Sequence, residues 1–282
     1  MRTWGEERDA GHLALRAAGI STPALDADLL LAHVLGVTKE TLYAHPDTEM
    51  SHGAMRRYRE LIERRAGGEP VAYLRGFKEF YGLRFAVDPR VLIPRPETET
   101  LVDTARELIG GRAVSVVDVG TGSGAVAIAI AVHEPAALVI ATDISGDALA
   151  VAHANALSNG VADRVTFREG DLLEPISPPV DVVVANLPYL RDDTLRRLVQ
   201  DRVSLAFEPR VAVTAGQNGV ELIWRAAFDL RRVLGPNGAA LFEVDPPLAG
   251  EVVTLLRDAV GGQTRVVRDL AGDERVVTVE IP

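Results

Sequence analysis

The stretch Val180–Tyr189, VDVVVANLPY, combines a strongly apolar segment with an abrupt stop. Its β-branched run, Val182–Val184, is typical of a strand that is buried on both faces of a parallel sheet. The strand ends before Pro188, because proline has no N–H to donate to a neighbouring strand. Side chains that follow the carboxyl end of a parallel strand face the crevice where open α/β sheets bind ligands. We therefore expect Asn186–Tyr189 to line a binding site.

The residues of this turn can hold a planar amino group. The Asn186 side-chain oxygen and the Leu187 carbonyl can each accept one hydrogen bond from an NH2 group, while the Tyr189 ring packs against its plane. Pro188 stiffens the turn. The same tetrapeptide is also compatible with an ordinary proline turn that follows a strand, so by itself it leaves both interpretations open.

Strands and helices alternate from residue 114 onward with short connections. Such alternation predicts an α/β domain with a mostly parallel sheet and right-handed crossovers, to which a final hairpin adds antiparallel strands. We expect an irregular stretch between Tyr189 and Phe207 and a turn at residues 235–238. The predicted strands are 114–120, 138–143, 165–171, 180–186, 239–245, 265–270 and 274–281, and the predicted helices are 125–132, 147–158, 219–234 and 251–259.

The region before residue 67 is helical in pattern and contains little that is typical of a strand. Helices are predicted at 4–18, between Pro23 and Gly36, at 39–44 and at 51–65, and together they form a small bundle. Aromatic and polar residues then alternate around two glycines, as in a β-hairpin. The predicted domains are 1–67, a hairpin linker at 68–95, and 96–282. Arg95, held between two prolines, is assigned to the site.

Composition limits the class of protein. The 282 residues carry a net charge of -10, which argues against a protein that follows nucleic-acid phosphates. Cysteine is absent, so disulfides, thiolate metal sites and a cysteine nucleophile are excluded. The six histidines form no convincing metal cluster, and no metal is expected. The N-terminus lacks an apolar leader, and no apolar run has transmembrane length, so we expect a soluble, cytoplasmic protein.

A second polar turn, Asp118–Gly124 (DVGTGSG), follows the strand predicted at 114–120. Its three alternating glycines let the backbone approach a ligand closely, and the N-terminus of a helix lies behind them. Asp143 ends the next strand, where its carboxylate can accept hydrogen bonds from both hydroxyls of a ribose. These features predict a pocket for a cofactor that contains adenosine.

Two such cofactors fit the residues. The sequence GTGSGA satisfies the relaxed dinucleotide pattern, so a nicotinamide-dependent dehydrogenase is one interpretation. S-adenosylmethionine is the other, and Asp118 favours it, because a carboxylate is unfavourable beside a pyrophosphate but compatible with an ammonium and a sulfonium. Asp171, after the third strand, either accepts from an adenine amino group or caps a helix or turn.

Several motifs in order resemble the HemK/PrmC family, the peptide chain release factor N5-glutamine methyltransferases. The resemblance covers nearly all of the chain from residue 68 onward, and the helical region before it has the size and place of the family's N-terminal domain. The motifs are GEPVAYLRGFKEFYGLRFAVDPRVLIPRPETE at 68–99, DVGTGSGAVAIAIA at 118–131, Asn-x-Pro-Tyr at 186–189, FEPRVAV at 207–213 and DERVV at 273–277.

This resemblance implies a class I S-adenosylmethionine-dependent methyltransferase, with a Rossmann-like seven-stranded sheet and a helical domain that recruits the substrate. The implied acceptor is the Gln of the Gly-Gly-Gln motif in release factors. By position, Asp143 holds the ribose, Leu172 flanks the adenine, and Asn186 with the Leu187 carbonyl holds the glutamine amide against Tyr189. The residues implied around the methionine part are Gly120, Thr121, Gly122, Ser123 and Gly124.

The sequence departs from the family pattern at two places. Leu187 stands where the family usually has proline, so either only its carbonyl matters or its side chain packs on a neighbour. Glu243–Asp245 reads Glu-Val-Asp where the family tends to have Glu-x-Gly. Three other functions stay open: an N6-adenine or other exocyclic-amine methyltransferase acting on nucleic acid, which the acidic charge disfavours, the dehydrogenase, and an inactive adaptor that only binds release factors.

Overall fold

The protein is described by a computed structural model that covers residues 2–177, 179–201 and 203–281. The chain divides into two compact units. The first comprises Met1–Phe77 together with Leu198–Phe207, and the second comprises Lys78–Arg197 and Glu208–Pro282. Each unit has hydrophobic core residues of its own, so each is described separately.

The first unit is a helical bundle, as its sequence pattern predicts. Its first helix begins with a capping box, in which Thr3 and Glu6 satisfy each other's backbone N–H groups. Leu30, Leu31 and Tyr58 lie in its core, each at most 1% exposed. The helices are α1 (Trp4–Ala17), α2 (Pro23–Leu35), α3 (Lys39–Ala44), α4 (His52–Ala66) and α5 (Val71–Arg75).

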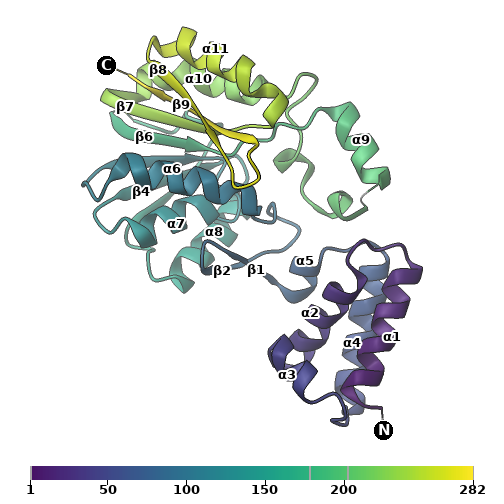
Figure 1. The fold of residues 1–282 in the computed structure, drawn as a ribbon. Helices are drawn as coiled ribbons and strands as arrows, with labels where there is room; N and C mark the ends of the chain where they lie inside the picture. The colour runs from purple at the N-terminus through teal and green to yellow at the C-terminus, as the bar shows by residue number, and fades with distance from the viewer. Residues whose placement is uncertain (1, 178, 202, 282) are drawn as a thin grey trace. The chain divides into compact units, whose positions relative to one another are not determined.

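The second unit is built on the seven-stranded sheet that the alternation predicts (Figure 1). The strand order is β5-β4-β3-β6-β7-β9-β8, and every pairing is parallel except those of β9. The chain runs outward from β3 to β5 and then returns to place β6 on the other side of β3, which creates a topological switch point. The strands are β3 (Ser115–Val119), β4 (Leu138–Asp143), β5 (Val165–Glu169), β6 (Val180–Ala185), β7 (Leu234–Glu243), β8 (Gln263–Arg268) and β9 (Glu274–Glu280).

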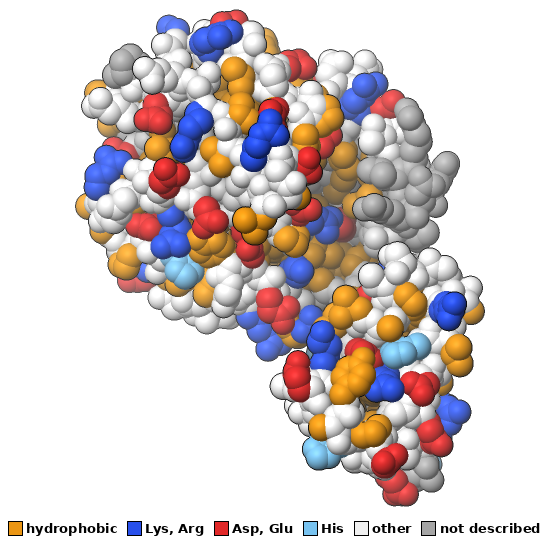
Figure 2. Space-filling view, viewed as in Figure 1, with side chains coloured by type: hydrophobic (Ala, Val, Ile, Leu, Met, Phe, Trp, Pro, Cys, Tyr) orange, Lys and Arg blue, Asp and Glu red, His pale blue; other side chains and the backbone are white. Residues whose placement is uncertain are grey.

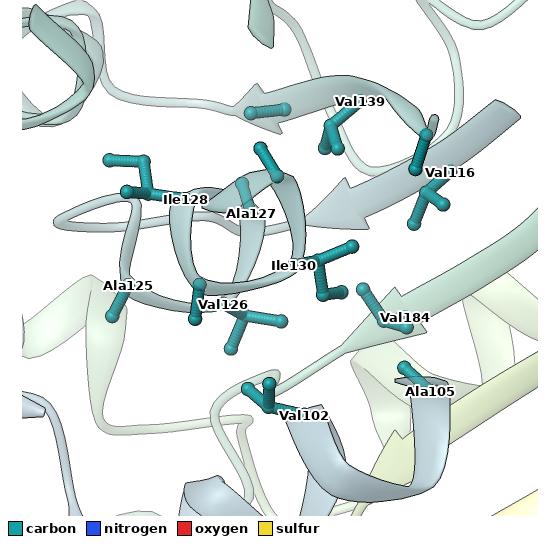
Figure 3. Packing of buried hydrophobic residues seen from close by; sticks show 14 of the residues in the cluster. Val102, Ala105, Val116, Ala125, Val126, Ala127, Ile128, Ile130, Val139 and Val184 are labelled. Carbon is teal, nitrogen blue, oxygen red and sulfur yellow. The ribbon is translucent and has the colours of Figure 1, made fainter. Parts of the chain in front are cut away.

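Helices cover both faces of this sheet (Figure 1). In Figure 3, Ile130 of α7 and the α6 residues Val102 and Ala105 lie around Val184 of β6. Residues 125–131 of α7 are all buried, as expected for a helix that is apolar on all sides. One face carries α6 (Glu99–Ile109), α7 (Ala125–His133) and α8 (Gly146–Ser158), and the other carries α10 (Glu221–Val233) and α11 (Ala249–Val260).

Three segments differ from the sequence prediction. The predicted hairpin is present as β1 (Phe77–Phe80) and β2 (Leu83–Ala86). The short helix α5 precedes it and was not predicted; this helix ends at Gly76, which adopts the left-handed conformation. The stretch after Tyr189, expected to be irregular, contains α9 (Asp192–Asp201), which begins with two acids at its positive end. The turn expected at 235–238 is part of β7, whose pairing with β6 shifts register there.

Candidate active site

The glycine turn between β3 and α7 has two structural tasks. Gly122 adopts a left-handed backbone (φ 55°), and a Cβ placed there would meet nothing within 4 Å, so this position faces open space. Gly124 is also left-handed (φ 81°), but its Cβ would lie 2.8 Å from Ile128 Cδ1 and 3.1 Å from Ala152 Cβ. Gly122 therefore leaves room for a ligand, whereas Gly124 lets α7 pack closely on α8.

Asp118 is buried and accepts hydrogen bonds from this turn and from the start of α7. Its side chain is 2% exposed, and its Oδ2 accepts hydrogen bonds from Thr121 Oγ1 at 2.7 Å and from the Ala127 N–H at 3.1 Å. Burial raises the pKa of Asp118 to about 6, against the effect of these hydrogen bonds. Ser123 is buried as well, and its carbonyl accepts from Asn155 Nδ2 at 2.8 Å. Three predicted site residues thus shape the turn.

Asp143, at the end of β4, is bound to the same turn. Its Oδ2 accepts from the Gly122 N–H at 2.8 Å, and its Oδ1 accepts from the Ser145 N–H at 2.9 Å. Burial raises the pKa of Asp143, and the backbone donors act in the opposite direction. Each carboxylate oxygen keeps a further lone pair, so Asp143 can still accept from the two hydroxyls of a ribose.

A cavity lies at the carboxyl ends of β3, β4 and β6, and we call it the larger cavity. Its walls combine polar residues, among them the acids Asp143 and Asp171, with apolar side chains such as Leu172 and Leu222. Ile144 also lines it and is 57% exposed, although apolar. We did not predict Ile144 from the sequence; the only signal is its place directly after Asp143. Apolar walls beside a ribose acceptor suit the purine of an adenosyl group, so the residues present fit S-adenosylmethionine.

The lining of the larger cavity includes an ion pair that the sequence did not predict. Arg225 Nη2 of α10 lies 2.5 Å from Asp171 Oδ2, and both residues line the cavity. The adjacent Leu172 has a left-handed backbone (φ 51°), and its carbonyl accepts from Thr142 Oγ1 at 3.0 Å. This conformation is uncommon for leucine and marks a constrained turn. Asp171 therefore lies where predicted but already has a charged partner.

The Asn186 side chain lies between the larger cavity and a smaller cavity that also contains Arg95, Thr98 and Asp118. Its Nδ2 donates a hydrogen bond to Thr98 Oγ1 at 2.9 Å, which leaves the Asn186 Oδ1 as the acceptor atom of the amide. Thr98 is 4% exposed and belongs to the short 3-10 helix Pro96–Thr98. We did not predict Thr98, because its partner is 88 positions away in the sequence.

The rest of the predicted acceptor turn is largely enclosed. Leu187 is 2% exposed, and Pro188 lines the larger cavity. Burial raises the pKa of Tyr189 to about 12, so its hydroxyl is neutral near pH 7.

Arg95, the remaining predicted site residue, has a carboxylate partner. Its Nη2 lies 2.6 Å from Oε1 of Glu208. Glu208 is 7% exposed and also accepts a hydrogen bond from the Ile93 N–H at 3.2 Å.

Glu243, the last residue of β7, is a buried acid beside this turn. It is 1% exposed, and among the described residues its Oε2 has no hydrogen-bond partner. Burial raises the pKa of Glu243 to about 7, while the Thr98 hydroxyl and the charge of Arg275 act in the opposite direction. The sequence marks this position only as part of the Glu-Val-Asp departure from the family pattern.

Three further observations concern metal sites, membrane-spanning helices and surface charge. Among residues 2–177, 179–201 and 203–281, no group of three or more acidic or histidine side chains is arranged to hold a metal ion. Within the same ranges, no helix is both long enough and apolar enough to cross a membrane. In the view of Figure 2, acidic and basic side chains are interspersed over the second unit rather than gathered into a basic surface.

The seven-stranded sheet, with its glycine turn at the switch point and an acid at the end of the adjacent strand, defines a class I S-adenosylmethionine-dependent methyltransferase. Residues 8–76 match the PrmC N-terminal domain, and residues 98–216 match the ribosomal protein L11 methyltransferase (PrmA) family. The chain belongs to the release factor glutamine methyltransferase family. This membership confirms the resemblance seen in the sequence.

The family assignment rests on relatives that match over nearly their whole length. The release factor glutamine methyltransferase of Koribacter versatilis is 41% identical over 97% of this chain and 97% of its own. That of Bordetella pertussis is 42% identical over 90% of this chain and 93% of its own. That of Deinococcus radiodurans is 39% identical over 93% of each chain. At these levels of identity and coverage, the whole chain shares the family's architecture.

Solved structures agree on the fold alone. The hMettl16 catalytic domain, solved with an RNA hairpin, has a TM-score of 0.57 and 16% identity, and the match covers 79% of this chain and 84% of that one. A methyltransferase from Pyrococcus furiosus has a TM-score of 0.50 and 15% identity, covering 77% of this chain and 95% of that one. Because identity is so low, these structures confirm the methyltransferase fold and carry no information on the substrate.

Leu187 provides a first prediction. A Cβ on Gly120 would lie 3.1 Å from Leu187 Cδ2, so the leucine packs against the glycine turn as part of the core. We expect Leu187→Ala to lower the free energy of unfolding by about 2–4 kcal/mol, because it leaves a cavity, and to lower activity with it. Leu187→Met should cost less than about 1.5 kcal/mol. Denaturant unfolding measures both, and equal stability of Leu187→Ala and wild type would show that only the backbone matters here.

Glu243 provides a second prediction, on pH. Its pKa rises from an ordinary value of 4.5 to about 7 on folding. The contribution of Glu243 to the free energy of unfolding is therefore fully present below pH 4.5 and is lost as pH rises to about 7. Relative to wild type, Glu243→Gln should therefore gain stability across this window, by up to about 3 kcal/mol. Unfolding at pH 5 and pH 8 measures the difference. A stability difference that does not change with pH would mean that Glu243 does not titrate there.

Proposed function

We propose that the protein transfers the methyl group of S-adenosylmethionine to the side-chain amide nitrogen (N5) of the Gln in the Gly-Gly-Gln motif of peptide chain release factors. The observation that supports this most is the Asn186 side chain. Its Nδ2 is bound to Thr98, so Oδ1 is left to accept a hydrogen bond at the junction of the two cavities. Its relatives in Koribacter versatilis and Bordetella pertussis are named release factor glutamine methyltransferases.

The chemistry requires orientation more than acid or base. A carboxamide nitrogen is a poor nucleophile, because its lone pair is delocalised into the carbonyl. When Asn186 Oδ1 and the Leu187 carbonyl accept its two hydrogens, the nitrogen is fixed in one orientation and electron density is returned to it. When bound, S-adenosylmethionine supplies a methyl group on a positively charged sulfur. No base is needed, since the nitrogen becomes acidic as it gains the methyl group and can release its proton to water.

Other groups complete the proposed site. Tyr189 packs on the amide plane with a neutral hydroxyl, since its pKa is about 12. Asp143 holds the ribose, and Ile144 and Leu172 flank the adenine. Asp171 accepts from the adenine amino group only if its ion pair with Arg225 leaves a lone pair free. Arg95 shapes the smaller cavity through its pair with Glu208. A release-factor substrate also places the enzyme in the cytoplasm, where translation ends.

Acceptor assays test this proposal against the nucleic-acid alternative. With labelled S-adenosylmethionine, we expect methyl transfer to intact release factor and none to adenine-containing DNA or RNA. Methylation of nucleic acid without transfer to the factor would refute the proposal. A thermal-shift measurement tests the alternative that the protein is a nicotinamide-dependent dehydrogenase. S-adenosylhomocysteine should raise the melting temperature of the protein, whereas NAD should leave it unchanged.

The helical first unit is proposed to recruit the release factor without taking part in the chemistry. A protein that begins at Glu69 should still bind S-adenosylhomocysteine, because the residues proposed for the cofactor all lie in the second unit. It should methylate intact release factor at least about tenfold more slowly at low substrate, while a short Gly-Gly-Gln peptide loses little, since uniform binding energy is removed. Equal rates on the intact factor for both proteins would dismiss the recruiting role.

A further inference from the structure

Two arginines of α10 contact residues 170–177, the segment after β5, which we call the β5 loop. Arg225 and Arg232 are seven positions apart, so they lie on the same face of the helix. Arg232 Nη2 donates a hydrogen bond to the Leu173 carbonyl at 2.8 Å, and its Nη1 donates to the Ile176 carbonyl at 2.9 Å. Arg232 therefore fixes the backbone of the β5 loop on α10.

Arg225 contacts the β5 loop through a side chain instead. Its Nη2 donates to Asp171 Oδ2 at 2.5 Å, and both residues line the larger cavity. Among the described residues that line this cavity, Arg232 and the two residues whose carbonyls it holds are not found. The side chains of Arg225 and Asp171 are 46% and 31% exposed, and ion pairs that water reaches contribute little to stability. Stability alone therefore does not account for this pair.

The pair leaves one oxygen of Asp171 available to a ligand. The guanidinium of Arg225 engages Oδ2, and among the described residues no other group donates to the Asp171 carboxylate. Oδ1 therefore keeps its lone pairs at a wall of the larger cavity. The amino group of adenine is a donor, whereas a purine without that group offers nothing to a carboxylate at this position. A correctly oriented Oδ1 can thus distinguish the two.

The backbone around Asp171 is already held in place, so the remaining freedom is in its side chain. The Asp171 carbonyl accepts from the Glu174 N–H at 3.0 Å. The Leu172 carbonyl accepts from Thr142 Oγ1, also at 3.0 Å. The carboxylate can still turn about its own side-chain torsions, and the contact with Arg225 fixes them. Without Arg225, the carboxylate would be free to turn toward solvent.

We propose that Arg225 is a positioning residue that orients the Asp171 carboxylate toward the amino group of the cofactor's adenine, and that it thereby makes the site selective for adenine. This inference rests on the place proposed above for the adenine, between Ile144 and Leu172. An arginine suits this task, because its planar guanidinium holds a carboxylate in a more defined orientation than a lysine ammonium does.

Two ligands that differ only in the amino group test the inference in the full-length protein. Calorimetry compares S-adenosylhomocysteine with its purine analogue, in which hydrogen replaces the amino group. We expect wild type to bind S-adenosylhomocysteine at least about tenfold more tightly, because one hydrogen bond to a charged group is lost with the analogue. Arg225→Met should reduce this preference to less than about threefold, Arg225→Lys should retain part of it, and Asp171→Ala should abolish it.

Arg232→Met is the matched control on the same helix face. It frees the backbone of the β5 loop without touching Asp171, so it should weaken both ligands by the same factor and keep the preference. In the double variant Asp171→Ala, Arg225→Met, S-adenosylhomocysteine should bind no more weakly than in Asp171→Ala, because Arg225 acts through Asp171. The melting temperature of each variant shows that it is folded.

The outcomes separate positioning from a structural role. An undiminished preference in Arg225→Met, or equal weakening of both ligands in that variant, overturns the inference. Equal binding of the two ligands by wild type also overturns it, because Asp171 then does not contact the amino group. Release factor is absent from these measurements, so the inference can fail while methyl transfer to the factor stands. Failure of the proposed function would instead appear as a wild-type enzyme that does not methylate the factor.

Discussion

Replacing Asn186 with alanine is expected to lower kcat for release-factor methylation by about 10²–10³-fold, the usual effect of removing one oriented hydrogen-bonding group from an active site. The larger cavity keeps Asp143 and its apolar walls, so the affinity for S-adenosylhomocysteine should fall by less than about tenfold. Single-turnover kinetics and calorimetry measure the two quantities. We expect kcat to change more than cofactor affinity, because the Asn186 amide, which is hydrogen-bonded to Thr98, is proposed to hold the methyl acceptor rather than the cofactor.

Asn218→Ala is the matched control for this experiment, since Asn218 is an exposed asparagine outside both cavities. It should leave kcat and cofactor affinity unchanged. If Asn186→Ala instead loses cofactor binding while its kcat at saturating cofactor equals that of wild type, the residue belongs to the cofactor site and the acceptor must be held elsewhere.

The second large effect concerns Asp143. Asp143→Ala removes the proposed acceptor for two ribose hydroxyls, a loss of roughly 1.5–3 kcal/mol for hydrogen bonds to a charged group. The dissociation constant for S-adenosylhomocysteine should therefore rise about 10- to 150-fold. The same carboxylate holds the Gly122 and Ser145 N–H groups, so the glycine turn loosens as well and the upper part of this range is expected.

Calorimetry measures the affinity of Asp143→Ala directly, and saturating S-adenosylmethionine should restore much of its rate. Asp147→Ala is the control, because Asp147 is an exposed acid four positions away that does not line the larger cavity. An unchanged affinity in Asp143→Ala would mean that the end of β4 does not contact the cofactor.

The sheet and the glycine turn were predictable from local sequence. A run such as Val182–Val184 favours burial on both faces, and alternating glycines between a strand and a helix are typical of a ligand-binding turn. Two helices were not predicted. The five-residue helix α5 runs directly into the hairpin, and α9 lies in the stretch that was expected to be irregular. Their identity depends on capping geometry and on tertiary packing rather than on a periodic pattern.

Side-chain partners across the fold were not predictable in the same way. Thr98 is 88 positions from Asn186, and Glu208 is 113 positions from Arg95. Such pairs depend on which strands become neighbours, so they leave no local period in the sequence. The motif at 94–99 shows the limit clearly: the sequence singles out Arg95, whereas Thr98, in the same motif, bonds the proposed acceptor-binding residue. Glu243 had no local signal beyond its place at a strand end.

The most direct test of the account is to locate the methyl group. Intact release factor is incubated with the enzyme and S-adenosylmethionine, digested, and mapped by tandem mass spectrometry. We predict the mass of one methyl group on the side chain of the Gln in the Gly-Gly-Gln motif, present with wild-type enzyme and strongly reduced with Asn186→Ala. A methyl group on any other residue, or an unmodified factor under conditions in which the enzyme binds S-adenosylhomocysteine, would contradict the proposed function.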